Sequence, residues 1–116
     1  MAKVLIVYCS RTGNTEEMAK ALEQGAKTVS AEVVRKKATE VEPADFLDCG
    51  AVAFGSPTNF GYMAGALKEV FDSILWNIRK QVTGLPYATF GSGQRGTAKV
   101  LEVIEGMPIF AIEKGW

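Results

Sequence analysis

Short apolar runs alternate with amphipathic stretches along the chain. Residues 3–8 read KVLIVY, a β-branched run without polar alternation, which is typical of a central parallel strand covered on both faces. Over residues 15–27 the apolar side chains of Met18, Leu22 and Ala26 recur four apart, which predicts a helix with one apolar face. A strand followed directly by a helix is the unit from which α/β sheets are built.

The same alternation continues to the end of the chain. Asn14 and, three residues later, Glu17 resemble a capping box at the start of the first helix. Apolar residues at 3.6-residue spacing predict a second long helix; they are Met63, Leu67, Val70, Phe71, Ile74, Leu75 and Ile78. Further strands are expected at residues 31–35, 49–55, 86–90 and 107–112, and shorter helices from Pro43 and over 97–105.

Strict alternation of strand and helix predicts a single α/β domain over residues 1–116, with helices on both faces of a parallel sheet. In such sheets a ligand binds beyond the carboxyl ends of the strands, where the strand order reverses. The loops after the first, third and fourth strands are therefore the candidate site. They read CSRTGNT, SPTNFGYM and GSGQRG, all rich in glycine and in small polar residues.

The composition gives no support for a nucleic-acid-binding protein, a zinc protein or a membrane protein. Lys plus Arg equals Asp plus Glu at 13 each, so charge gives no argument for a nucleic-acid partner. Cys9 and Cys49 are isolated and the chain has no histidine, which argues against a zinc site and favours reduced thiols. The first apolar run is too short for a signal peptide or a membrane span, so a cytoplasmic protein is expected.

The first loop suits an anion. A loop between a strand and a helix N-terminus presents free backbone N–H groups and the positive end of the helix dipole. Three familiar loops do not match it: no lysine follows Gly13 as in a P-loop, Thr15 stands where a tyrosine phosphatase has arginine, and the stretch lacks GxGxxG.

The pattern that is present, Ser10-x-Thr12-Gly13-Asn14-Thr15, resembles the [ST]xTGxT signature with which flavodoxins hold the phosphate of FMN. The stretch after the third predicted strand is similar to the GSPTxFGxM stretch of short flavodoxins and of quinone reductases of the tryptophan-repressor-binding-protein type. The resemblance implies one non-covalently bound FMN, contacted by Ser10, Arg11, Thr12, Gly13, Asn14, Thr15, Ser56, Pro57, Thr58, Asn59, Phe60, Gly61, Ser92, Gly93 and Gln94.

The resemblance also implies a flavodoxin-like doubly wound sheet of five parallel strands in the order 2-1-3-4-5. Flavodoxins usually continue into a last helix beside the first, whereas this sequence stops at Trp116. Without that helix, apolar surface of the sheet would be left bare, which either a dimer or a truncated chain would explain; a homo-oligomer is expected. Trp76 and Trp116 lie outside the expected cofactor loops and are interpreted as packing residues, and Cys9 as a small packing residue beside the phosphate loop.

Three functions remain open. The resemblance favours an electron carrier that passes electrons between redox partner proteins through FMN, with no catalytic residue of its own. An FMN-dependent NAD(P)H:quinone oxidoreductase is the alternative, because the charge is balanced and the second loop resembles that of such enzymes. A flavodoxin-like interaction scaffold or fragment without FMN is the third.

Overall fold

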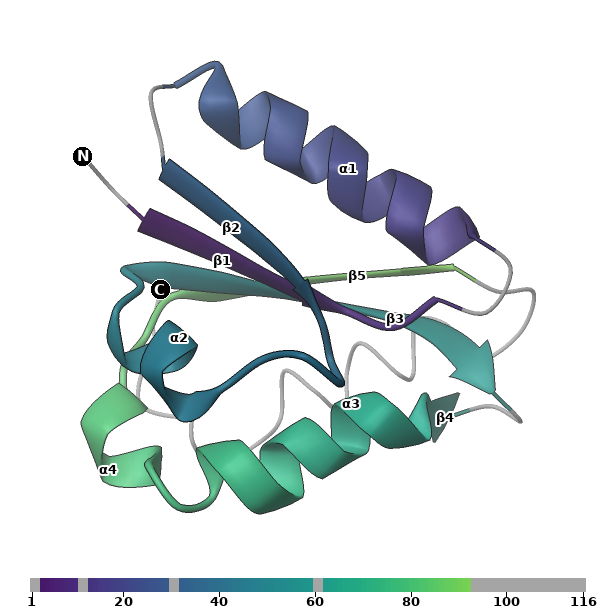
Figure 1. Cartoon of the computed structure of the whole chain (residues 1–116). Helices are drawn as coiled ribbons and strands as arrows, with labels where there is room; N and C mark the ends of the chain where they lie inside the picture. Colours follow the sequence, from purple (N-terminus) through teal and green to yellow (C-terminus); the bar gives the residue numbers. More distant parts are fainter. Residues whose placement is uncertain (1–2, 11–12, 30–31, 60–61, 93–116) are drawn as a thin grey trace.

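The computed structural model describes residues 3–10, 13–29, 32–59 and 62–92 (Figure 1). The helix expected at 97–105 and the strand expected at 107–112 lie outside these residues. None of the described helices is both long and apolar enough to cross a membrane.

The described strands form a parallel sheet in the predicted order. β1 (Lys3–Tyr8) lies between β2 (Glu32–Lys37) and β3 (Ala51–Asn59), and β5 (Tyr87–Ser92) pairs with the other side of β3. The order β2-β1-β3-β5 confirms the first four strands of the flavodoxin-like arrangement. A short strand that the sequence pattern does not indicate, β4 (Tyr62–Met63), turns back antiparallel on the end of β3.

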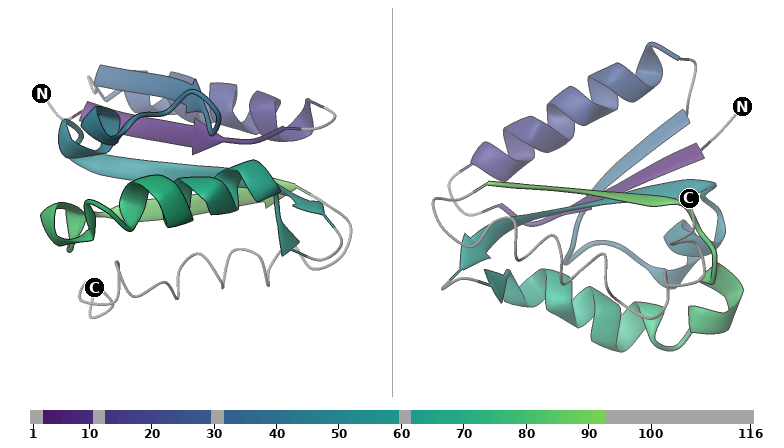
Figure 2. Two further views of the ribbon diagram at one scale, coloured as in Figure 1. Left: turned by 60° about the horizontal axis from the view of Figure 1, so that its bottom comes forward. Right: turned by 180° about the vertical axis from the view of Figure 1, so that it is seen from behind.

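Helices cover both faces of the sheet, as right-handed crossovers between parallel strands require. Figures 1 and 2 show α1 (Asn14–Lys27) on one face. The opposite face carries α2 (Pro43–Leu47), α3 (Gly65–Glu69), the π-helical η1 (Val70–Leu75) and α4 (Arg79–Val82).

Alternation along the central strands divides the core between the two faces. On the α1 side, Ile6 and Tyr8 pack with Ala19 and Ala53. On the other side, a larger cluster buries every second residue of β1 and β3 against the helices; its largest members include Leu5, Phe46, Phe54, Leu67 and Phe71. Apolar burial on both faces explains why KVLIVY lacks polar alternation.

The start of α1 differs from the expected capping box. Gly13, with φ 94°, is the N-cap residue, and it has no side chain with which to cap the helix. The prediction for Asn14 and Glu17 was therefore wrong, because a glycine at positive φ turns the chain into the helix before Asn14 can act as the cap. The predicted apolar face is also displaced: Thr15 and Ala19 are buried, whereas Met18 and Leu22 remain 38% exposed.

The second long helix is irregular. Met63, expected within it, belongs to β4, and the predicted continuous α-helix becomes α3 followed by η1. Its predicted apolar face is otherwise confirmed, because Leu67, Val70, Phe71 and Leu75 are buried while Ile74 and Ile78 pack against the same cluster. Trp76 was wrongly expected to be a packing residue: it is 61% exposed, with the Arg79 guanidinium 4.0 Å from its ring centroid.

Candidate functional site

The carboxyl ends of β1, β3 and β5 meet at one edge of the sheet. Tyr8, the last residue of β1, is the register partner of Gly55 in β3, and Pro57 further along β3 is the partner of Ser92 in β5. The prediction that these strands end at a common edge is therefore confirmed. This edge includes the point between β1 and β3 where the strand order reverses.

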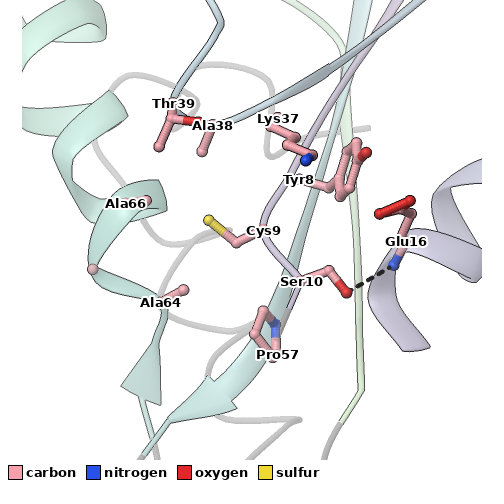
Figure 3. Close-up of a pocket in the computed structure, with 11 residues that line it drawn as sticks. Tyr8, Cys9, Ser10, Glu16, Lys37, Ala38, Thr39, Pro57, Ala64 and Ala66 are labelled. Atoms are coloured by element: carbon pink, nitrogen blue, oxygen red, sulfur yellow. Dashed lines mark hydrogen bonds between the residues drawn. The ribbon is translucent and has the colours of Figure 1, made fainter. Parts of the chain in front are cut away.

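A cavity of about 460 Å³ opens at this edge (Figure 3). It lies between the N-termini of α1 and α3, and the end of β2 closes its third side. Most of its lining residues are small, which is why the edge is hollow; they are Tyr8, Cys9, Ser10, Glu16, Lys37, Ala38, Thr39, Pro57, Ala64, Gly65 and Ala66.

Ser10 joins the first loop to the N-terminus of α1. Its hydroxyl oxygen accepts hydrogen bonds from the backbone N–H groups of Gly13, at 3.0 Å, and Glu16, at 3.3 Å. The bond to Glu16 is drawn in Figure 3. The backbone N–H groups of Gly13 and Glu16 therefore converge on one oxygen atom at the start of α1.

This donor set fits the phosphate of FMN. Backbone N–H groups at a helix N-terminus bind phosphate oxygens through their hydrogens and through the helix dipole. A serine hydroxyl that accepts hydrogen bonds still keeps its own proton to donate. A Cβ built on Gly13 would meet no atom within 4 Å, so space for such a group lies open beside the turn.

The other members of the first loop are placed differently. Asn14 is the first residue of α1 and is exposed. Thr15 is buried, at 1% exposure. Arg11 and Thr12 lie outside the described residues. The expected contacts of these four residues with FMN stay predictions.

A hydrogen bond of the Ser56 side chain joins the two ends of the second loop. Ser56 is fully buried; its hydroxyl donates to the Pro57 carbonyl at 2.7 Å and accepts from the Ala64 N–H at 2.9 Å. The latter bond joins the end of β3 to the start of α3, across the segment expected to lie along the flavin. The Ser56 side chain is thus occupied by the protein itself, whereas Pro57 lines the cavity.

The remaining predicted contacts are located by their backbone or lie outside the described residues. Thr58 and Asn59 end β3 and pair with β4, and Ser92 ends β5 beside Pro57. Phe60, Gly61, Gly93 and Gln94 fall outside the described residues. The expected roles of all these residues towards FMN stay predictions.

Sequence reasoning missed the contribution of β2. The cavity is also lined by Lys37, Ala38 and Thr39, which end β2 and follow it, and by Glu16 in the first turn of α1. The Ala38 N–H donates to the Tyr8 carbonyl at 2.8 Å, which holds this segment against the end of β1. The signal was available, because β2 ends at the same edge as β1 in a parallel pair.

Cys9 points from the end of β1 towards α3 (Figure 3). It packs against the larger core cluster, as expected of a small packing residue, and both Cys9 and Cys49 are free thiols. Burial raises the pKa of the Cys9 thiol above its ordinary value, and the Leu67 backbone opposes this effect only in part. A raised pKa keeps the thiol protonated at neutral pH, so Cys9 is a poor nucleophile.

Comparison with known proteins agrees with this geometry. The family model described as Flavodoxin matches residues 6–105. A flavodoxin of Aquifex aeolicus is 37% identical over 93 residues, which cover 79% of this chain and 50% of that protein. An NAD(P)H dehydrogenase (quinone) of Archaeoglobus fulgidus is 31% identical, with 96% of this chain and 73% of the relative covered.

The fold is shared with solved structures as well. The solution structure of two-electron reduced Megasphaera elsdenii flavodoxin superposes with a TM-score of 0.77 at 26% identity, covering 88% of this chain and 73% of that one. The chain spans half the length of the Aquifex flavodoxin. The strand order, the phosphate-type loop and the family match lead to one conclusion: the chain belongs to the flavodoxin family, whose cofactor is FMN.

Proposed function

We propose that the chain carries electrons between redox partner proteins through an FMN whose phosphate binds at the N-terminus of α1. The proposal rests on one observation: the N–H groups of Gly13 and Glu16 both donate to the Ser10 hydroxyl, which lines the cavity at the edge where the strand order reverses. When bound, FMN supplies the redox chemistry. The protein binds the cofactor, orients it and shields it from water.

Each described part has a distinct task in this proposal. The first turn of α1 and Ser10 bind the phosphate, which sets the position of the cofactor at the sheet edge. The bond between Ser56 and Ala64 holds the base of the second loop, which is expected to lie along the flavin ring. Small side chains at Ala64, Gly65 and Ala66 keep the cavity open.

Binding is tested first by titrating FMN and riboflavin separately into the chain and following the quenching of flavin fluorescence. FMN is expected to bind at least about a hundredfold more tightly than riboflavin, because riboflavin has no phosphate for the α1 N-terminus to bind. Ser10→Ala should reduce this preference. Equal affinities for the two flavins, or no quenching by either, would refute the proposal.

The carrier role is tested by anaerobic reductive titration of the FMN-loaded chain, followed by its visible spectrum. A carrier is expected to take up the electrons in separate steps, so that a spectrum distinct from both end states accumulates midway. A single transition from the oxidised to the fully reduced spectrum would contradict a one-electron role.

Quinone reduction is the second candidate function. It is supported by the 31% identity to a relative named NAD(P)H dehydrogenase (quinone), of which the chain covers 73%. The balanced charge of the chain is compatible with this activity. FMN-loaded protein that oxidises NADH or NADPH only when a quinone is present would favour it over the carrier.

A further inference from the structure

The end of β2 brings a cation to the anion site. Lys37 is the register partner of Tyr8, so the two residues lie side by side at the edge of the sheet. Successive residues of a strand point to opposite faces. Lys36 forms an ion pair at 3.0 Å with Asp45, which belongs to α2, so Lys37 faces the α1 side, beside Tyr8 (Figure 3).

An ion pair between β2 and α1 shows how these two elements are aligned. Arg35, two residues before Lys37 on the same face of β2, has its Nε 2.6 Å from the Glu23 carboxylate of α1. Moving along β2 from Arg35 to Lys37 leads to the carboxyl edge of the sheet, where α1 begins. Lys37 and Glu16, a residue of the first turn of α1, accordingly line the same cavity as Ser10.

Lys37 forms no ion pair within the part of the chain that the structure describes. The basic residues that do so there are Lys3, Lys20, Lys27, Arg35, Lys36 and Lys68. Glu16, the carboxylate that lines the cavity with Lys37, has its own partner in Lys20 at 3.8 Å. The Glu40 carboxylate accepts a hydrogen bond from the backbone N–H of Lys37 at 3.2 Å, which leaves the ammonium group out of that contact.

We infer that Lys37 is a specificity-determining residue for the phosphate group bound at the N-terminus of α1. The inference rests on the proposed FMN site and deepens it, by adding a mobile ammonium charge to a site built otherwise from N–H groups and a hydroxyl. A lysine beside a doubly charged phosphate attracts it as a point charge. The attraction operates partly through solvent, because the Lys37 side chain is exposed, so salt screens it.

The test measures FMN and riboflavin affinities of the wild type, Lys37→Gln and Lys37→Arg at low and high ionic strength. Lys80→Gln is the matched control, because Lys80 is also exposed, forms no ion pair among the described residues and lies in α4 on the opposite face. Lys37→Gln is expected to weaken FMN binding about fivefold to tenfold at low salt and to leave riboflavin binding unchanged. Lys37→Arg should retain most of the affinity, and Lys80→Gln all of it.

The salt dependence gives a second readout that a structural role would not change. FMN affinity of the wild type should fall more steeply with added salt than that of Lys37→Gln, so that the two converge at high ionic strength. FMN affinity of Lys37→Gln equal to that of Lys80→Gln, or an equal loss for riboflavin, would overturn the inference and leave the proposed function standing. Failure of the wild type to bind FMN would overturn both.

Discussion

The ring of Phe90 occupies the space above Gly55. The two residues are register partners in β5 and β3, and a Cβ built on Gly55 would lie 2.2 Å from Cε2 of Phe90. Phe90 packs with the cluster on the α1 side, and Ala88, two residues earlier in β5, is exposed. The glycine therefore lets an aromatic ring from the neighbouring strand lie close to the backbone, one residue before Ser56.

Gly55→Ala should lower the free energy of unfolding by about 1–3 kcal/mol, because the ring of Phe90 must move away from the new methyl group. The Phe90→Ala variant removes the clash, so Gly55→Ala should cost about 1 kcal/mol less in that background. Urea unfolding of the wild type, both single variants and the double variant measures this coupling. Additive effects of the two substitutions would contradict the contact.

Ser56→Ala should destabilise the protein by about 1–3 kcal/mol, because the Ala64 N–H would lose its acceptor in a buried position. The matched control is Ser73→Ala: Ser73 is exposed and its hydroxyl donates to the Glu69 carboxylate, so its loss should change stability by about 0.5 kcal/mol or less. The FMN affinity of Ser56→Ala should fall as well, because the hydrogen bond that joins the two ends of the second loop is lost. Stability equal to that of the control would refute the structural role of Ser56.

Alanine substitutions of Gly13, at the start of α1, and of Gly25, within it, should change the stability of the protein in opposite directions. Gly13→Ala should cost about 1–2 kcal/mol, because φ 94° is unfavourable for any residue with a Cβ. Gly25 is exposed within α1, and a Cβ built on it would meet no atom within 4 Å, so Gly25→Ala should stabilise the protein by about 0.5–1 kcal/mol. The denaturant midpoints of the two variants measure these changes. Midpoints that shift in the same direction would contradict the prediction.

Acid should weaken the contact between α1 and β2. Hydrogen bonds from Arg35, and next from Lys27, hold the pKa of Glu23 below its ordinary value of 4.5. A carboxylate with a lowered pKa in the folded state stabilises the protein above its unfolded pKa, and this stabilisation is lost as the pH falls through the folded pKa. The wild type should therefore lose stability below about pH 4.5, by about 1 kcal/mol or less from this partly exposed group.

Glu23→Gln measures that contribution. Its free energy of unfolding should fall less steeply than that of the wild type between about pH 5 and about pH 3, because the titrating partner of Arg35 is gone. Equal slopes for the two proteins would show that Glu23 does not couple acid to unfolding.

Local patterns determined much of this protein without the tertiary structure. Apolar periodicity located the described parallel strands and the long helices to within a few residues, because side-chain burial on a strand or helix follows its own period. The alternation of strands and helices predicted a parallel sheet with helices on both faces, and the resemblance of the loops to those of flavodoxins implied the order β2-β1-β3-β5. The first loop could be compared with the phosphate-binding loop of flavodoxins from the sequence alone, because its residues are contiguous.

Contacts between distant segments could only be decided by the tertiary structure. The hydrogen bond between Ser56 and Ala64 engages a side chain that was expected at the cofactor, because a buried hydroxyl must find partners within the protein. The sequence already indicated that β2 ends at the same edge as β1, but the register that sets Lys37 beside Tyr8 depends on pairing between two strands, which no local pattern expresses. Burial of Trp76 was wrongly expected because apolar character does not reveal which side of an irregular helix meets the core.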